Sequence, residues 1–220
     1  MDERYHLISI IASTQHGAVS HDQMNASGID RYVRRRWVKR GLIIASGPRS
    51  YVIAGSASSW ERSLWTASAD VGKSGYIAGR AAARLLGLDG FVDDVVELLV
   101  PREHRSLRTP HVVRSTTFPL ERSDSVTVDG IRCLTAERLI LDSPLFGFTR
   151  HETENAIDSA IRQRLVSEQR LRTRVIARHR RSINGGRMLL DALIDSGGES
   201  RLERLFLRIV RAAGLPRPEL

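Results

Sequence analysis

The stretch from Gly28 to Tyr51 concentrates side chains that bind phosphate and guanine. It contains seven basic residues and a single acid, Asp30. Arginine can pair bidentately with O6 and N7 of guanine, and both arginine and lysine neutralise phosphates. The chemistry that this stretch offers is therefore recognition of a nucleic-acid duplex.

Six of the seven basic residues belong to one predicted helix, residues 31–40, and the seventh, Arg49, lies at the tip of the predicted hairpin. Asp30 is a good N-cap for this helix, and Gly41 is a typical stop. At about 100° per residue, Ile29, Val33 and Trp37 share the side that packs inward. The opposite side is predicted to carry Arg31, Arg34, Arg35, Val38 and Lys39, with Arg36 and Arg40 at its flank.

The position of each basic residue along the helix suggests its role on DNA. Base reading usually comes from the N-terminal part of a recognition helix, so Arg31, Arg34 and Arg35 are predicted to read bases. The predicted contacts to phosphate or to an adjacent groove are Ser20, Gln23, Lys39, Arg40 and Arg49. The alternative is that these arginines form only a solvated face.

The bulk charge agrees with a polyanionic partner. The 220 residues carry a formal net charge of +9. Only Lys39 and Lys73 are lysines, and such an excess of arginine also arises in GC-rich genomes, so the distribution of charge counts for more than its sum. A second basic run, residues 162–187, contains nine arginines and one acid, and it is interpreted as the wet side of surface helices or as a second polyanion site.

Other constellations are weaker. Residues 67–74 nearly spell a phosphate-binding loop, but alanine replaces the first glycine, and the preceding segment looks helical where such a loop needs a strand. Asp93, Asp94 and Glu97 could suggest a carboxylate metal site, yet they more plausibly mark the entry to a strand. The histidines lack metal-ligand spacing. No metal, cofactor or catalytic residue is therefore expected.

Cysteine usage and hydropathy indicate the compartment. The single cysteine, Cys133, allows no intrachain disulfide and is expected to be buried. The N-terminus lacks the positive charge of a signal peptide, and no stretch approaches the ~20 apolar residues of a membrane span. A cytoplasmic protein without a membrane partner is predicted.

The order of predicted elements indicates an α+β chain in three parts. Helices over 4–15, 21–26 and 31–40 and a hairpin of strands 42–45 and 50–54 give residues 1–55 the order of a winged helix-turn-helix. Residues 60–196 read as a mixed α/β domain. Its predicted helices are 60–71, 77–86, 136–143, 149–166, 167–180 and 186–195, and its predicted strands are 94–100, 110–116 and 125–128. A last amphipathic helix, 200–213, opens a third part, residues 199–220.

Residues 12–55, ASTQHGAVSHDQMNASGIDRYVRRRWVKRGLIIASGPRSYVIAG, resemble the N-terminal winged helix of AbiEi-type antitoxins from type IV toxin–antitoxin systems. GYIAGRAAARLLGL and VTVDGIRCLTAERLILDSP resemble later stretches of that family, although Gly79 replaces a serine-like position and Pro144 interrupts the last helix. The resemblance implies a winged helix that represses its own operon and a C-terminal domain associated with antitoxicity.

The C-terminal segment GGESRLERLFLRIVRAAGLPRPEL resembles the opening helix of Vsr-like endonuclease domains of the PD-(D/E)XK superfamily, with Glu203 at the position of that helix's acid. The metal-binding carboxylates of that family would lie beyond residue 220. The resemblance therefore implies a chain that does not cut DNA alone.

Three hypotheses stay open at this level. The first is a DNA-binding regulator of the AbiEi antitoxin kind, with double-stranded DNA and a cognate toxin as partners and a homodimer on DNA as one arrangement. The second is the targeting portion of a Vsr-like DNA endonuclease. The third is a module that docks an acidic protein through its basic surfaces.

Overall fold

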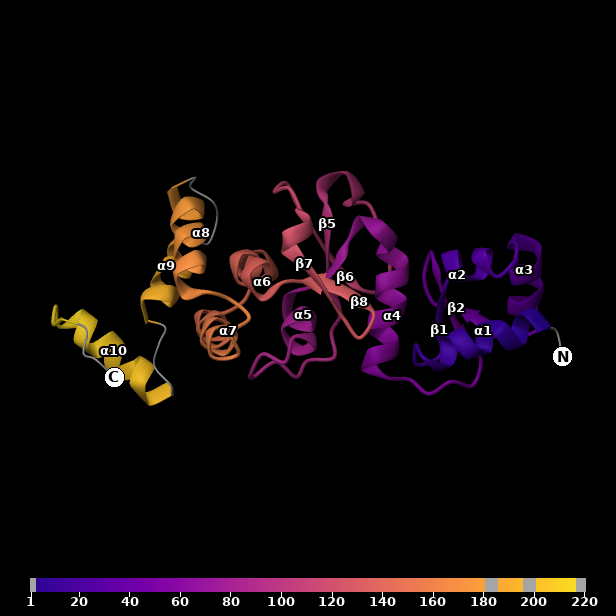
Figure 1. Ribbon diagram of the computed structural model, residues 1–220, viewed down its shortest axis with the longest axis horizontal. Coiled ribbons are helices and arrows are strands. Elements are labelled where there is room, and N and C mark those ends of the chain that lie inside the picture. Colours follow the sequence, from indigo (N-terminus) through magenta and orange to yellow (C-terminus); the bar gives the residue numbers. More distant parts are fainter. Residues whose placement is uncertain (1–2, 181–185, 196–200, 217–220) are drawn as a thin grey trace. The chain divides into compact units, whose positions relative to one another are not determined.

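The computed structural model describes residues 3–180, 186–195 and 201–216, and it is a mixture of helices and strands (Figure 1). The chain divides into two compact units, residues 1–81 with 93–133 and residues 82–92 with 134–220. The first unit joins the predicted DNA-binding segment, residues 1–55, to a second sheet. The predicted boundaries at residues 55, 60 and 196 remain predictions about which parts fold independently.

Three helices and a small sheet make up the N-terminal part of the first unit. The helices are α1 (Glu3–Ser13), α2 (His21–Ala26) and α3 (Arg31–Lys39), and the strands are β1 (Ala18–Ser20), β2 (Ile43–Ala45) and β3 (Ser50–Ile53). The sheet is antiparallel in the order β1-β3-β2. The three helices and the hairpin confirm the predicted elements within a residue or two at most bounds, whereas β1 was not predicted because three residues are too few to show a period.

A single apolar cluster holds these elements together. Its buried members are Ile8, Val19, Met24, Ile29, Trp37 and Ile43. The Tyr5 ring meets the Trp37 ring edge to face, with centroids 5.4 Å apart. Ile29 and Trp37 are therefore inward as predicted, and Val33 is half-buried against the same cluster.

A five-stranded sheet forms the rest of the first unit, in the order β6-β5-β4-β8-β7. Its strands are β4 (Tyr76–Ala78), β5 (Glu97–Pro101), β6 (Val112–Thr116), β7 (Ser125–Val128) and β8 (Ile131–Leu134). β4 is antiparallel to β5 and parallel to β8, and β5 is parallel to β6. Helix α4 (Trp60–Val71) packs on β4 and β5 with one side and on β1 and β3 with the other (Figure 1).

The predicted helix over 77–86 was wrong at its start. Residues 76–78 form β4, and α5 (Gly79–Leu85) begins only after it. Gly79 takes a φ of +55°, which breaks the extended chain sharply before the helix. A run as short and apolar as Tyr76–Ala78 has no period by which a buried strand could be distinguished from a buried helix. Strand β8 was missed for the same reason.

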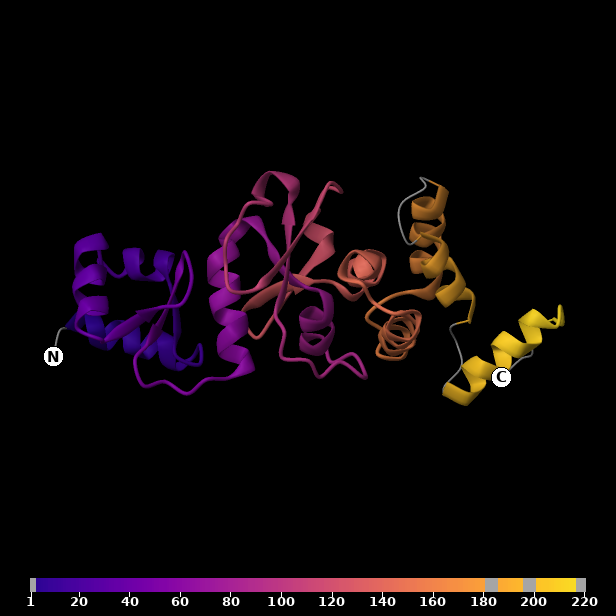
Figure 2. The same cartoon turned by 180° about the vertical axis from the view of Figure 1, so that it is seen from behind.

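The described residues of the second unit form helices and turns. It contains α6 (Ala136–Asp142), α7 (Arg150–Arg162), α8 (Glu168–Arg180), α9 (Gly186–Asp195) and α10 (Arg201–Ala212). Figure 2 shows α8 and α9 side by side, in agreement with their packing. In the described parts of the chain, no helix combines the length and apolarity that crossing a bilayer requires.

The predicted third part begins with α10, near its expected bounds. Residues 196–200 and 217–220 and the side chain of Glu203 lie outside what the structure describes. The resemblance of this segment to a Vsr-like domain therefore remains a prediction.

Candidate nucleic-acid interface

Helix α3 presents a row of basic side chains to solvent. Asp30 starts the helix, because its Oδ1 accepts a hydrogen bond of 2.8 Å from the Val33 backbone N–H. The exposed basic residues of the helix and its C-cap are Arg31, Arg35, Arg36, Lys39 and Arg40. Among the described residues, none of these five forms a hydrogen bond or an ion pair with another side chain. Their charges are therefore available to a partner.

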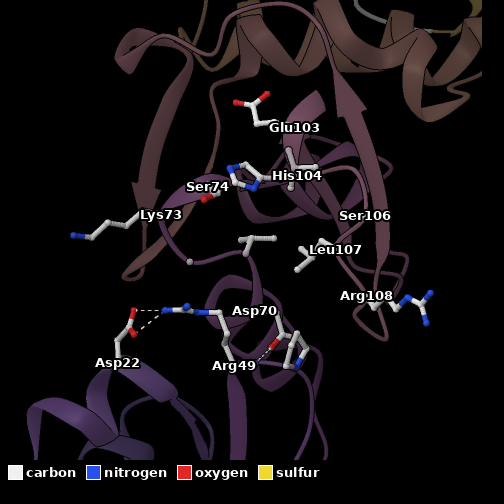
Figure 3. A pocket seen from close by; sticks show the side chains of 14 residues that line it. Asp22, Arg49, Asp70, Lys73, Ser74, Glu103, His104, Ser106, Leu107 and Arg108 are labelled. Atoms are coloured by element: carbon white, nitrogen blue, oxygen red, sulfur yellow. Dashed lines mark hydrogen bonds and ion pairs between the residues drawn. The ribbon is translucent and has the colours of Figure 1, made fainter.

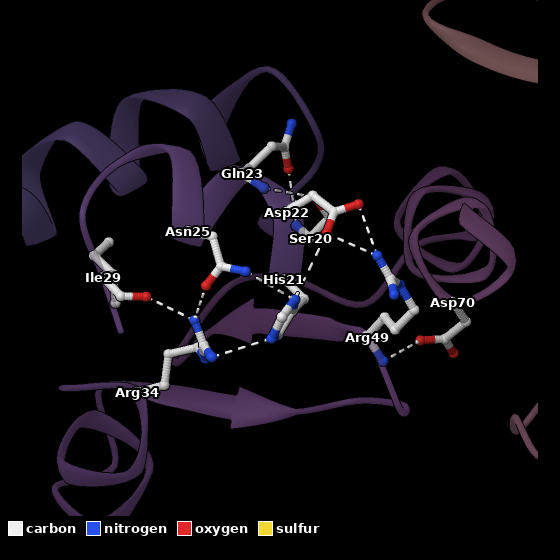
Figure 4. Close-up of polar contacts among 9 residues, drawn as sticks. All are labelled: Ser20, His21, Asp22, Gln23, Asn25, Ile29, Arg34, Arg49 and Asp70. Carbon is white, nitrogen blue, oxygen red and sulfur yellow. Dashed lines mark hydrogen bonds and ion pairs between the residues drawn. The ribbon is translucent and has the colours of Figure 1, made fainter. Parts of the chain in front are cut away.

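Arg34 does not belong to this row, and its predicted outward orientation was wrong. Its side chain is only 7% exposed. The Nη1 atom donates to Asn25 Oδ1 and to the Ile29 carbonyl, both at 2.6 Å. The Nη2 atom lies 3.0 Å from His21 Nε2 (Figure 4). Arg34 therefore joins α3 to α2 and to the turn between them.

The inward turn of Arg34 has a structural cause. It lies three residues before Trp37, so both project toward the side of α3 that packs on α2. The Ile29 carbonyl lies in the turn between α2 and α3, and a buried carbonyl needs a donor. The guanidinium supplies several donors at once, which fixes the angle at which α3 presents its other basic residues.

Ser20 and Gln23 form reciprocal hydrogen bonds with each other. The Ser20 Oγ accepts the Gln23 backbone N–H at 3.1 Å, and the Gln23 Oε1 accepts the Ser20 backbone N–H at 2.8 Å. This reciprocal capping box starts α2. Both residues thus stabilise the start of α2, and the Ser20 hydroxyl hydrogen and the Gln23 side-chain amide nitrogen are the donors left for the predicted phosphate contacts.

Arg49 lies in the hairpin turn, which we define as residues 46–49 between β2 and β3. Its Nη2 atom lies 2.7 Å from both carboxylate oxygens of Asp22 on α2 (Figure 4). Desolvation raises the pKa of Asp22, but the charge and hydrogen bond of Arg49 outweigh it, so this pKa lies below its ordinary value. Both side chains are exposed, and such a pair contributes only about 0–1 kcal/mol. Arg49 could exchange Asp22 for a phosphate at small cost.

The hairpin turn is anchored by a buried carboxylate of α4. Asp70 is 2% exposed, and its Oδ1 accepts the Arg49 backbone N–H at 3.0 Å. Its Oδ2 accepts the Thr109 hydroxyl at 2.8 Å. The backbone of Arg49 is therefore held by the buried carboxylate of Asp70, while its side chain forms only the exposed pair with Asp22.

The segment that resembles a phosphate-binding loop is built differently. Residues 67–71 end α4, and Gly72–Ser74 form a 3₁₀ turn before β4. The carbonyls of Gly72 and Gly75 accept hydrogen bonds from Arg132 at 2.8 and 3.1 Å. A helix thus precedes the segment where a phosphate loop has a strand, which agrees with the interpretation from the sequence.

The acidic residues between 93 and 97 lie at the start of a strand, as predicted, where a carboxylate metal site was the alternative. Glu97 begins β5, and its carboxylate accepts the Arg80 backbone N–H at the start of α5. Burial raises the pKa of Glu97 above its ordinary value, against the lowering effect of Arg80. In the described parts of the chain, no group of three or more histidine, cysteine or acidic residues could hold a metal ion.

The second basic run is neutralised in part within its own unit, where three of its nine arginines form ion pairs among the described residues. Arg170 and Arg174 on α8 both reach the carboxylate of Glu137, at 3.0 Å each. Arg162 pairs with Asp89. Arg164 and Arg172 are exposed. These pairings favour the interpretation of this run as the wet side of surface helices.

The fold is similar to that of a solved protein. The crystal structure of the RV2827C protein from Mycobacterium tuberculosis superposes with a TM-score of 0.51, over 97% of this chain and 81% of that chain. The sequence identity is 16%, so the likeness concerns the fold alone. No protein-family model and no curated protein matches the chain.

Proposed function

We propose that residues 1–55 form a winged helix-turn-helix that binds double-stranded DNA, with α3 in the major groove and the hairpin as the wing. The observation that carries the proposal is the row of five exposed basic side chains on a capped helix, none of them engaged by another described side chain. A helix fits the major groove, and arginine is the side chain best suited to guanine there.

The contacts fall into two classes on this proposal. Arg31 and Arg35 lie in the N-terminal half of α3 and read base edges. Lys39 and Arg40 at its end and Arg49 in the wing contact phosphates, which position the protein without reading sequence. Arg34 is a positioning residue for α3, because its guanidinium donates hydrogen bonds to Asn25 and to the Ile29 carbonyl within the protein.

Tyr32 joins the base-reading class, although it was not among the predicted site residues. It is 80% exposed at the second position of α3, between Arg31 and the later arginines. A ring this exposed has few apolar contacts within the protein. On DNA it would gain one by packing on a thymine methyl group. The signal that could have indicated it is a large aromatic residue on the outward side of the helical wheel.

We extend the proposal to regulation on the strength of the sequence resemblance. A chain like the AbiEi-type antitoxins would bind a repeat upstream of its own gene and repress the operon. Neutralisation of a toxin, formation of a homodimer on DNA and cytoplasmic location stay predictions.

The decisive experiment measures DNA binding by a double variant. Arg31→Ala with Arg35→Ala removes two base contacts of about 1–3 kcal/mol each, so affinity for a selected duplex should fall roughly 30-fold or more. The duplex is found by selecting the purified chain against random DNA, and affinity is measured by fluorescence anisotropy.

The matched control is Arg164→Ala with Arg172→Ala, which removes the same charge from exposed positions of the second unit. It should bind like the wild type, and all three proteins should melt alike. Unchanged affinity in the α3 variant would refute the assignment of this helix. Retention of an acidic protein without DNA retention would favour a docking module, and DNA cleavage with Mg²⁺ would favour the endonuclease.

A further inference from the structure

A second set of unpartnered basic side chains lies outside the α3 row. We call residues 102–108, which follow β5, the basic loop. Arg102, Arg105 and Arg108 are exposed, and Glu103 is the one acid among them. In the part of the chain that the structure describes, none of the three arginines is engaged by a hydrogen bond or an ion pair of its side chain. No described acid pairs with these arginines in the way that Glu137 pairs with Arg170 and Arg174 on α8.

The basic loop is fixed beside the hairpin turn. The buried carboxylate of Asp70 bonds the Arg49 backbone with one oxygen and the Thr109 hydroxyl with the other. Thr109 directly follows the loop. One hollow of about 740 Å³ is bordered by both segments, with Arg49 on one side and His104, Leu107 and Arg108 on the other (Figure 3).

The hollow itself is a poor site for an anion. Its lining includes Asp22, Asp70 and Glu103 as well as its cations. The side chains of Lys73 and Arg108 extend away from it on opposite sides (Figure 3). The positive charge of this region is therefore carried outward, where an extended surface can meet it.

We propose that the basic loop is a second contact to the DNA backbone, which extends the footprint beyond the wing. This inference rests on the proposed function. Three arginines three residues apart, without an exposed apolar residue among them, suit phosphates, which need charge and no pocket. An acidic protein partner would need an apolar centre to its interface, and the loop offers only the half-buried Leu107.

The test compares the salt dependence of binding on two duplexes. The slope of log K against log salt concentration is negative, and each phosphate contact adds ~0.9 to its magnitude. On a long duplex, Arg105→Ala with Arg108→Ala should therefore reduce the magnitude of this slope by about 1.8. On a short duplex that holds only the selected site, the variant and the wild type should give the same slope and the same base preferences.

Arg164→Ala with Arg172→Ala again serves as the control of equal charge, and it should leave both slopes unchanged. An unchanged slope for the loop variant on the long duplex, with normal binding by the wild type, would overturn the inference while sparing the proposed function. If the wild type binds neither duplex, the proposed function itself fails. If the loop variant instead loses binding to a polyglutamate probe and keeps its binding to DNA, the inference would be overturned in favour of an acidic protein partner.

Discussion

At the scale of single residues, neighbouring arginines of α3 have opposite roles. Arg34 is 7% exposed and spends its donors on Asn25 and Ile29. Arg35 is exposed, and it forms no side-chain hydrogen bond or ion pair with any described residue. The chemical type is the same, and the position on the helix decides which arginine stabilises the protein and which remains exposed to a partner.

Replacing each of the two by alanine should separate these roles. Arg34→Ala leaves the buried Ile29 carbonyl without its donor, at about 1–3 kcal/mol for an unsatisfied group, and it also removes the hydrogen bond to the exposed Asn25. Arg35→Ala, the matched control, should stay within about 0.5 kcal/mol of the wild type. Chemical denaturation measures both. Equal stability of the two variants would contradict the inward placement of Arg34.

At the scale of elements, the close approach of the hairpin turn to α4 requires a glycine. A Cβ atom at Gly47 would lie 2.0 Å from Asp70 Oδ2. Glycine therefore lets the turn reach the carboxylate that holds it. The anchor fixes the hairpin turn, and with it Arg49, on the unit that also carries the basic loop.

A double-mutant cycle should detect this contact. Gly47→Ala should destabilise the protein by about 1–3 kcal/mol through overpacking. Asp70→Ala should also destabilise it, because the Arg49 N–H loses its acceptor. In the Asp70→Ala background, however, the added methyl group no longer meets a carboxylate, so Gly47→Ala should cost much less there. Strictly additive free energies of unfolding would exclude the contact.

At the scale of the whole molecule, which carries a net charge of +9, the two units differ in how many of their basic side chains pair with acids. The second unit pairs several of its arginines with acids, as Glu137 does with Arg170 and Arg174. The first unit leaves the α3 row and the basic loop unpaired among the described residues. The first unit is therefore the one that we expect to dominate association with a polyanion.

The cysteine reports on the folding of this first unit. Cys133 lies on β8 with no exposure, and burial raises the pKa of its thiol to about 12. The thiolate is the reactive form, so almost none of it exists in the folded protein at pH 8. An alkylating reagent at that pH should modify Cys133 only in denaturant. Rapid modification without denaturant would contradict the burial of β8.

How much the sequence predicts depends on how local each signal is. Asp30, Gly41 and the spacing of Ile29 and Trp37 predict α3 and its inward side, because caps and helical periodicity act within a few residues. The α+β character, the predicted strands around β5, β6 and β7 and the burial of Cys133 follow from similarly local patterns. Short buried strands such as Tyr76–Ala78 carry no such pattern, and β4 and β8 were therefore missed.

The tertiary structure alone decided which basic side chains form hydrogen bonds or ion pairs within the protein. From the sequence alone, Arg34 cannot be distinguished from Arg35, nor Arg170 from Arg105, because all four are arginines in basic segments. Only the fold brings Asn25 to Arg34 and Glu137 to Arg170, across 9 and 33 positions of the chain. A hydrogen bond or ion pair depends on distance in space, and no spacing along the chain encodes it at such separations. The sequence thus determined that a basic helix would form, and the tertiary structure determined which of its side chains are left for a partner.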